Sequence, residues 1–122
     1  MHKQIITRYK DNPILTKDDV PYKVETVHNA GVAKFDGRYM MLFRSHRDNG
    51  RSIIGLAESS DGFNFTVRAE PFMVPAKDGV FGEYEAFGVE DPRIIFLEGV
   101  LYNVQRLFGA WCANRHGEDY GF

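Results

Sequence analysis

The sequence predicts an all-β protein built from short strands that follow one another along the chain. Three observations carry this prediction. Between residues 30 and 67, short apolar runs alternate with turns that contain glycine. One such turn, Asp36-Gly37, stands between two apolar runs, and this pair is the strongest short-range signal for a β-hairpin because both central turn residues need a positive φ. Residues 63–67 (FNFTV) place apolar side chains at alternate positions, as a half-buried strand does.

Four strands are predicted, in this order: residues 30–35, 38–45, 51–59 and 63–67. Turns at 46–50 and at Ser60-Asp61-Gly62 separate the later strands. A meander of four short strands has about the size of one β-propeller blade. Before it, residues 12–15 (NPIL) are interpreted as an arm that packs on the sheet. After it, residues 71–87 are predicted to form a long loop, and long loops in compact domains are often functional.

Composition and charge exclude several classes of function. The 122 residues suffice for one small domain, and 43% apolar and 14% aromatic residues supply a core and argue against disorder. The net charge of −2, with both signs interspersed, argues against nucleic acid or a membrane surface as the partner. A single cysteine, Cys112, excludes an intrachain disulfide framework, and neither a signal peptide nor a membrane span is expected. We therefore expect a cytoplasmic protein.

The chain contains an internal repeat of roughly 60 residues. Residues 32–39 (VAKFDGRY) and 94–101 (IIFLEGVL) each consist of an apolar run, an acidic residue followed by glycine, and the start of another strand. A period of this length is in the range of β-propeller blades that carry an inserted loop. The second copy therefore predicts the start of a second blade.

The stretch 87–94 (FGVEDPRI) holds the strongest candidate for a chemical site. Glu90 and Asp91 are adjacent carboxylates, and Arg93 follows after a proline that fixes the backbone. Repulsion between the two acids tends to raise the pKa of one of them, whereas Arg93 stabilises both as carboxylates, and the residues leave open which effect is larger. Only one of the acids is expected to face a ligand. A turn at the start of a strand with a surface salt bridge is the alternative interpretation.

Four motifs, in this order along the chain, resemble those of glycoside hydrolase family 130: residues 28–31 (HNAG), 42–44 (LFR), 54–62 (IGLAESSDG) and 88–94 (GVEDPRI). The family contains the β-mannoside phosphorylases and some β-mannosidases, and the resemblance runs from about residue 9 to residue 99. It implies part of a five-bladed β-propeller with an active site on the axis. It also implies inverting cleavage of a β-mannoside oligosaccharide by inorganic phosphate, a co-substrate, with no cofactor.

The resemblance also assigns roles to residues. Asp91 matches the family's general acid, which acts through a hydroxyl of the sugar, and a carboxylic acid is suited to this because a glycosidic oxygen leaves poorly until it is protonated. Asn29 and Arg44 match positions that hold the sugar near the cleaved bond, and we expect Glu90 and Arg93 to bind substrate beside them. From the residues alone, Asn29 also fits a turn-closing residue and Arg44 a solvated strand end. The histidines share no metal-ligand spacing, so no metal site is expected.

The chain is predicted to divide at Gly99 into a propeller part, residues 1–99, and an atypical tail, residues 100–122. The tail lacks alternation and contains the only Trp and the only Cys of the chain. A shift of one base near Gly99 permits a tyrosine-rich reading like that expected of a second blade. We therefore hypothesise a frameshifted tail, with a naturally divergent terminus as the alternative.

About one blade and part of the next would leave an apolar face and strand edges open, so we expect a chain that is marginally stable and associates with itself. The family's phosphate ligands lie in later blades, and the chain alone is expected to be inactive. Three functions stay open: a β-mannoside phosphorylase lineage, a β-mannoside hydrolase of the same fold, and a non-catalytic sugar-binding or interaction fragment.

Overall fold

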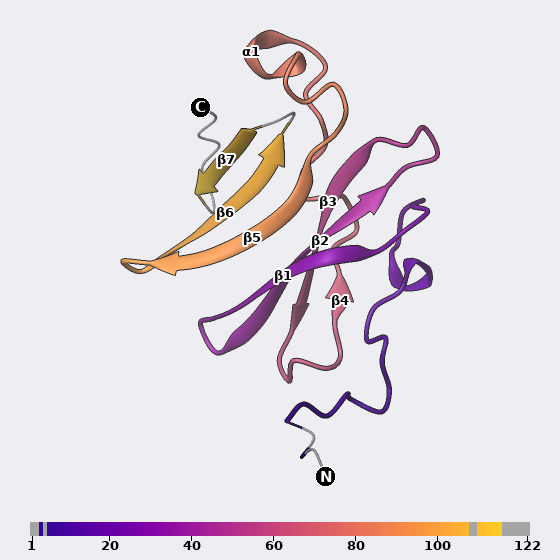
Figure 1. The fold of residues 1–122 in the computed structure, drawn as a ribbon, viewed down its shortest axis with the longest axis vertical. Helices are drawn as coiled ribbons and strands as arrows, with labels where there is room; N and C mark the ends of the chain where they lie inside the picture. The colour runs from indigo at the N-terminus through magenta and orange to yellow at the C-terminus, as the bar shows by residue number, and fades with distance from the viewer. Residues whose placement is uncertain (1–2, 4, 108–109, 116–122) are drawn as a thin grey trace.

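The computed structural model describes residues 3, 5–107 and 110–115, which form two antiparallel sheets (Figure 1). The first sheet consists, in this order, of β1 (His28–Phe35), β2 (Arg38–His46), β3 (Ser52–Ser59) and β4 (Thr66–Val67). The second consists of β5 (Glu90–Leu97), β6 (Val100–Leu107) and β7 (Ala110–Arg115). The all-β prediction is confirmed, with one four-stranded blade and part of the next.

The two predicted hairpins are present and have the same turn. Asp36 and Gly37 join β1 to β2 with φ values of 51° and 71°, and Glu98 and Gly99 join β5 to β6 with φ values of 50° and 78°. Two successive residues with positive φ give the backbone the twist that continues a right-handed hairpin. The internal repeat is therefore a structural repeat, in which the first hairpin of each sheet is built alike.

The fourth strand is shorter than predicted, with two residues in place of the five at 63–67. The side chain of Asp61 explains the difference. Its Oδ1 accepts hydrogen bonds from the backbone N–H groups of Phe63 and Asn64, both at 2.8 Å. These two N–H groups are thereby engaged in a local turn and do not join the ladder, so β4 begins only at Thr66.

The long connection at 71–87 is largely a loop, as predicted, but it also contains α1 (Gly79–Gly82), a single helical turn. Near its start, the loop runs beside β3, where the N–H of Ile54 donates to the carbonyl of Met73 at 2.9 Å. At its end, the N–H of Val89 donates to the carbonyl of Ser52 at 3.1 Å. The loop thus carries the chain along β3 and delivers it to the start of β5.

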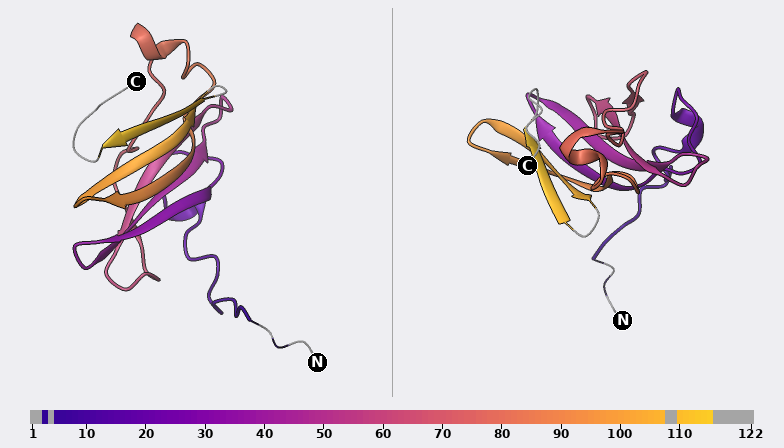
Figure 2. Two further views of the ribbon diagram at one scale, coloured as in Figure 1. Left: turned by 60° about the vertical axis from the view of Figure 1, so that its left-hand side comes forward. Right: turned by 90° about the horizontal axis from the view of Figure 1, so that it is seen from above.

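Apolar side chains on the two faces of the first sheet form two separate cores. One face packs against the segment before β1, which includes the short 3-10 helix η1 (Lys17–Asp19), and it buries Leu15, Phe43 and Ile53. This confirms that residues 12–15 contribute a packing arm. The other face packs against the second sheet and buries Leu42, Leu56, Val89 and Leu101. Figure 2 shows the second sheet inclined against the first, with only the beginning of the N-terminal segment leading away from both.

The sheets approach most closely where β1 passes β5. A Cβ atom added to Gly31 in β1 would lie 2.8 Å from the carbonyl oxygen of Pro92 in β5, a distance that real Cβ atoms do not reach. Glycine at this position lets the two backbones touch. No helix within the described residues is long and apolar enough to cross a lipid bilayer.

Candidate active site

The two inner strands, β1 and β5, carry the same irregularity at equivalent positions. The register of β1 shifts between His28 and Gly31, and Asn29 within this bulge has φ 50°. The register of β5 shifts in the same way after Glu90, and Asp91 within that bulge has φ 48°. Asn and Asp are the residues that tolerate this conformation best, and a bulge turns the extra side chain out of the normal alternation. The repeat therefore places Asn29 and Asp91, 62 residues apart, in matching positions of neighbouring blades.

The two bulges bring their side chains into direct contact. Nδ2 of Asn29 donates to Oδ1 of Asp91 at 2.8 Å. The same oxygen accepts from Nη1 of Arg44 at 3.1 Å. Among the described residues, no hydrogen bond to the second oxygen of Asp91, Oδ2, is found. The side chain of Asp91 is 20% exposed.

Arg44 is the centre of the cluster. Besides Asp91, it reaches Glu90, whose Oε1 accepts from Nη2 at 2.8 Å, and Ser52, whose Oγ accepts from Nε at 2.9 Å. Nη2 also lies 3.2 Å from Nε2 of His46. Within the described part of the chain, Arg44 thus donates three hydrogen bonds and places a further N–H of Nη2 beside Nε2 of His46, and one N–H on Nη1 is left for a ligand. Its side chain is only 16% exposed, which strengthens each of these contacts.

Ser52 is held in place by the start of β5. The residue is 1% exposed, and Gly88 lies directly against it. A Cβ atom on Gly88 would meet the backbone nitrogen of Ser52 at 2.5 Å, and Gly88 has φ 112°. Only glycine satisfies both conditions. The glycine before the acidic pair therefore sets the distance between β3 and β5, and with it the position of Glu90 and Asp91 relative to Arg44.

The pKa of Asp91 lies below its ordinary value of 3.8. Burial raises the pKa, but the hydrogen bonds from Asn29 and Arg44 and the positive charges of Arg44 and Arg93 lower it more. The sequence left open whether repulsion within the acidic pair or stabilisation by arginine is larger. For Asp91 the influences that lower the pKa prevail, first the hydrogen bond from Asn29 and then the hydrogen bond and charge of Arg44. In this state Asp91 is an ionised carboxylate at neutral pH.

The structure brings together four of the five residues predicted for the site, namely Asn29, Arg44, Glu90 and Asp91. Arg93 is placed differently. It is exposed, and its Nη1 donates to the carbonyl of Pro92 at 3.0 Å. Arg93 therefore acts on Asp91 only through its charge, and its predicted role in binding substrate stays a prediction.

Three further residues of the site, His28, His46 and Ser52, were missed by the sequence analysis. His28 stands opposite Arg44 in the pairing of β1 with β2, and its ring lies 4.9 Å from that of His46, measured between centroids. Burial lowers the pKa of His28, and the charge of Arg44 lowers it further. A usable signal was present in the spacing, because His46 follows Arg44 by two residues and alternate residues of a strand share a face. Ser52 gave no such signal, since its role depends on Gly88.

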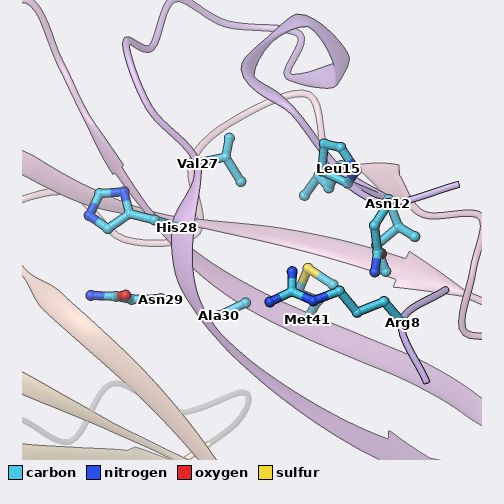
Figure 3. A pocket seen from close by; sticks show the side chains of 10 residues that line it. Arg8, Asn12, Leu15, Val27, His28, Asn29, Ala30 and Met41 are labelled. Atoms are coloured by element: carbon cyan, nitrogen blue, oxygen red, sulfur yellow. The ribbon is translucent and has the colours of Figure 1, made fainter. Parts of the chain in front are cut away.

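A hollow of about 500 Å³ lies on the other side of β1, between that strand and the N-terminal segment. Arg8, Leu15, Val27 and Met41 help to line it (Figure 3). Figure 3 shows the side chain of Asn29 on the opposite side of the β1 ribbon from Arg8. His28 and Asn29 of β1 also line the hollow, so it adjoins the carboxylate cluster at this strand. Within the part of the chain that the structure describes, no three His, Cys, Asp or Glu residues are grouped as metal ligands would be.

Two adjacent sheets, with carboxylates, an arginine and an amide gathered where their first strands meet, define the chain as part of a β-propeller. The chain belongs to glycoside hydrolase family 130. The model of that family, which is described as beta-1,4-mannooligosaccharide phosphorylase, matches residues 3–105. This match continues six residues beyond the predicted limit at Gly99.

Characterised relatives are mannoside phosphorylases. The chain is 29% identical over 123 residues to the 1,2-beta-oligomannan phosphorylase of Thermoanaerobacter sp. (strain X514), and 31% identical over 135 residues to the 4-O-beta-D-mannosyl-D-glucose phosphorylase of Bacteroides fragilis. Each comparison takes in 94% of this chain but only 38% and 32% of the relative, respectively. The chain therefore spans less than two fifths of the length of these relatives.

Solved structures show the fold. One, from work on family 130 hydrolases that target beta-1,2 mannosidic linkages in Candida mannan, has a TM-score of 0.75 at 24% identity, over 94% of this chain and 39% of that one. The beta-1,2-mannobiose phosphorylase of Listeria innocua has a TM-score of 0.69 at 21% identity, over 88% and 46%. These proteins are five-bladed β-propellers, and the two sheets of this chain correspond to a complete blade and part of the next.

The depressed pKa of Asp91 predicts how stability depends on pH. A carboxylate whose pKa is lowered by folding contributes stability that is fully present above its ordinary pKa of 3.8 and is lost as the pH falls through the lower folded value. We expect Asp91→Asn to lower the free energy of unfolding by about 2 kcal/mol at about pH 6, and by clearly less at about pH 3. Urea unfolding at both pH values measures this difference.

The control is Asp36→Asn, which makes the same chemical change at φ 51°, in the β1–β2 turn away from Arg44. It measures how much the same substitution lowers the free energy of unfolding at a position of positive φ that lies away from Arg44. An equal loss of stability for Asp91→Asn at both pH values would show that the charge of Asp91 contributes nothing to folding.

Proposed function

We propose that this chain carries the acid side of the active site of an inverting β-mannoside phosphorylase, with Asp91 as the general acid. The contact between Asn29, Arg44 and Asp91 is the observation that supports the proposal most strongly. These residues come from two blades, and they present one carboxylate oxygen, one N–H of Arg44 and an amide to a single point. A polyhydroxylated sugar requires such a mixture of acceptors and donors.

The chemistry follows from the two oxygens of Asp91. Oδ1 accepts from Asn29 and Arg44, whereas Oδ2 is open to a sugar hydroxyl. A bound sugar that takes over these two donors and excludes water would raise the pKa of Asp91, so that the acid is protonated when the substrate is present. The proton then passes from Asp91 to the sugar hydroxyl, and the proton of that hydroxyl passes to the bridging oxygen. The bond from the anomeric carbon to that oxygen breaks as phosphate attacks from the opposite face.

The remaining residues of the cluster orient these groups. Glu90 fixes Nη2 of Arg44, and Ser52 fixes Nε, so that Nη1 is directed at Asp91. Asn29 shares Oδ1 with Arg44 and can exchange this bond for one to the sugar. Arg93 contributes positive charge near the carboxylate, and in the proposed site it also contacts the substrate. Inorganic phosphate is the co-substrate, and no cofactor is required.

The 122 residues alone are proposed to bind sugar without turning it over. The relatives extend well beyond the part that this chain matches. By the family resemblance, the basic residues that hold phosphate lie in later blades. Catalysis needs the attacking group to be held in line with the anomeric carbon, and an acid on one side alone does not supply this.

A β-mannoside hydrolase is the second candidate. Hydrolases are named among the structural relatives with the same fold, in the family 130 protein related by a TM-score of 0.75. Cleavage by water needs a base that activates the water, in addition to the acid that Asp91 would supply. The dependence of turnover on phosphate separates the two candidates. A non-catalytic sugar-binding fragment is the third, and it shares the binding residues of the first.

The direct test is binding of β-mannobiose, followed in ¹H–¹⁵N spectra of the chain. We expect signals of the Asn29 side-chain amide and of Nε of Arg44 to shift, with cellobiose as the control sugar. Asp91→Asn should weaken binding up to about tenfold through loss of the hydrogen bond between Oδ2 and a sugar hydroxyl, whereas Asp36→Asn should not change it. A mannobiose titration that leaves these signals unmoved contradicts the proposal. Mannose 1-phosphate, formed only when phosphate is added, would show that the chain is active by itself.

Self-association is proposed for the open side of the second sheet. Ile95 and Leu97 of β5 are 50% and 57% exposed, although they stand in a strand of a sheet. In a ring of blades such a face is covered by the next blade.

We expect the chain to form dimers or larger species in light scattering after gel filtration. The double variant Ile95→Lys with Leu97→Lys should reduce them. Val80→Lys, at a 76% exposed position on α1, is the matched control. A monomer with a sharp thermal transition would refute this.

A further inference from the structure

His46 stands beside the carboxylate cluster without touching either carboxylate. It ends β2, two residues after Arg44, and its ring nitrogen Nε2 lies 3.2 Å from Nη2 of Arg44. The other ring nitrogen, Nδ1, lies 3.3 Å from Oγ1 of Thr26 in the segment before β1. The ring thus connects Arg44 to a part of the chain that holds none of the proposed catalytic residues.

The chemistry of arginine fixes the protonation of this ring. A guanidinium has donors and no acceptor, so the contact between Nη2 of Arg44 and Nε2 of His46 is a hydrogen bond only if Nε2 carries no proton. The proton of the neutral ring is then on Nδ1, where it can be donated to Oγ1 of Thr26. The same Oγ1 also accepts from the backbone N–H of His46 at 3.0 Å, which agrees with the two acceptor positions of a hydroxyl oxygen.

The position of the ring is set from several directions. The backbone carbonyl of His46 accepts from the N–H of Glu25 at 2.8 Å, which fixes the strand end against the preceding segment. The ring of His28 on β1 lies 4.9 Å away between centroids. The position of the acceptor Nε2 is therefore fixed, and it determines where Nη2 of Arg44 lies.

We propose that His46 is a positioning residue, whose neutral ring holds Arg44 in the orientation in which its guanidinium donates to both Glu90 and Asp91. The second N–H of Nη2 is used on His46 while the first is used on Glu90, so the plane of the guanidinium is defined by two acceptors on one nitrogen. When the ring takes up a second proton, the acceptor is lost and two cations face each other. The side chain of Arg44 then turns away from the ring, and its hydrogen bond to Asp91 weakens.

Charges around the ring come from three elements, and each enters this dependence on pH. Arg44 lies on β2 itself, His28 faces the ring from β1, and Glu90 and Asp91 face the cluster from β5. Glu25 precedes Thr26 in the segment before β1. Within the described part of the chain, His28 makes no hydrogen bond to Arg44, so His46 is the ring whose nitrogen faces Nη2 of Arg44.

The inference rests on the proposed function only for the role of Asp91 as the general acid. Its test does not require turnover. Long-range ¹H–¹⁵N correlations of the imidazole rings report which nitrogen of His46 carries the proton. The ¹³C signal of the Asp91 carboxyl reports its titration in the wild type, in His46→Gln and in His46→Ala. Glutamine offers an acceptor oxygen near the position of Nε2 and does not titrate, so it is the conservative variant.

We expect the Nδ1-protonated form of His46 in the wild type. His46→Ala should shift the titration of Asp91 upward, toward that of a free aspartate, whereas His46→Gln should keep it at the wild-type value. Thr26→Val removes the partner of Nδ1 and should give a smaller upward shift. The signal of Nε of Arg44 should stay at its wild-type position in His46→Gln and move in His46→Ala.

A ring protonated on Nε2, or an Asp91 titration that is the same in the wild type and in His46→Ala, would overturn the inference. Both results differ from a failure of the proposed function. In that case mannobiose would not bind, but His46→Ala would still shift the titration of Asp91. The tautomer of His46 is measured on the folded wild-type chain. This measurement therefore tests the inference even if a variant fails to fold.

Discussion

The guanidinium of Arg44 is the interaction on which the rest of the site depends. It belongs to the first sheet, yet two of its hydrogen bonds end on Glu90 and Asp91 in the second. Two adjacent carboxylates at the start of one strand repel each other, and a planar cation that donates to both removes this repulsion. With its side chain 16% exposed, Arg44 also needs partners for its other donors, and Ser52 and His46 supply two of them.

The second constraint is the repeated bulge. Asn29 and Asp91 occupy the same place in their hairpins, seven residues before Asp36 and Glu98 respectively, and all four have positive φ. One structural unit, used twice, thus produces an amide in the first blade and a carboxylate in the second. Gly31 allows the two units to approach until these side chains touch. The site therefore depends on the repetition of this unit as much as on its individual residues.

Much of this was predictable from the sequence, and the limits have physical reasons. The hairpin turns followed from Asp36-Gly37 and Glu98-Gly99, because local chemistry determines them. Family motifs identified residues that the fold then brought together. The short β4 was missed because the side chain of Asp61 competes with the strand for backbone N–H groups. The part played by Ser52 depends on the approach of β5 to β3, which no local pattern records. The boundary at Gly99 and the origin of the tail beyond it stay predictions.

The central claim is that Arg44 and Asp91 couple the two blades, and a double-mutant cycle measures this directly. Arg44→Gln, Asp91→Asn and the double variant are compared with the wild type by urea unfolding near neutral pH. Lys23 and Asp48, an exposed ion pair at 3.3 Å, serve as the reference cycle, with a coupling near zero. The account predicts a coupling energy of about 2 kcal/mol between Arg44 and Asp91. Additive losses, with no coupling beyond that of the reference pair, would contradict it.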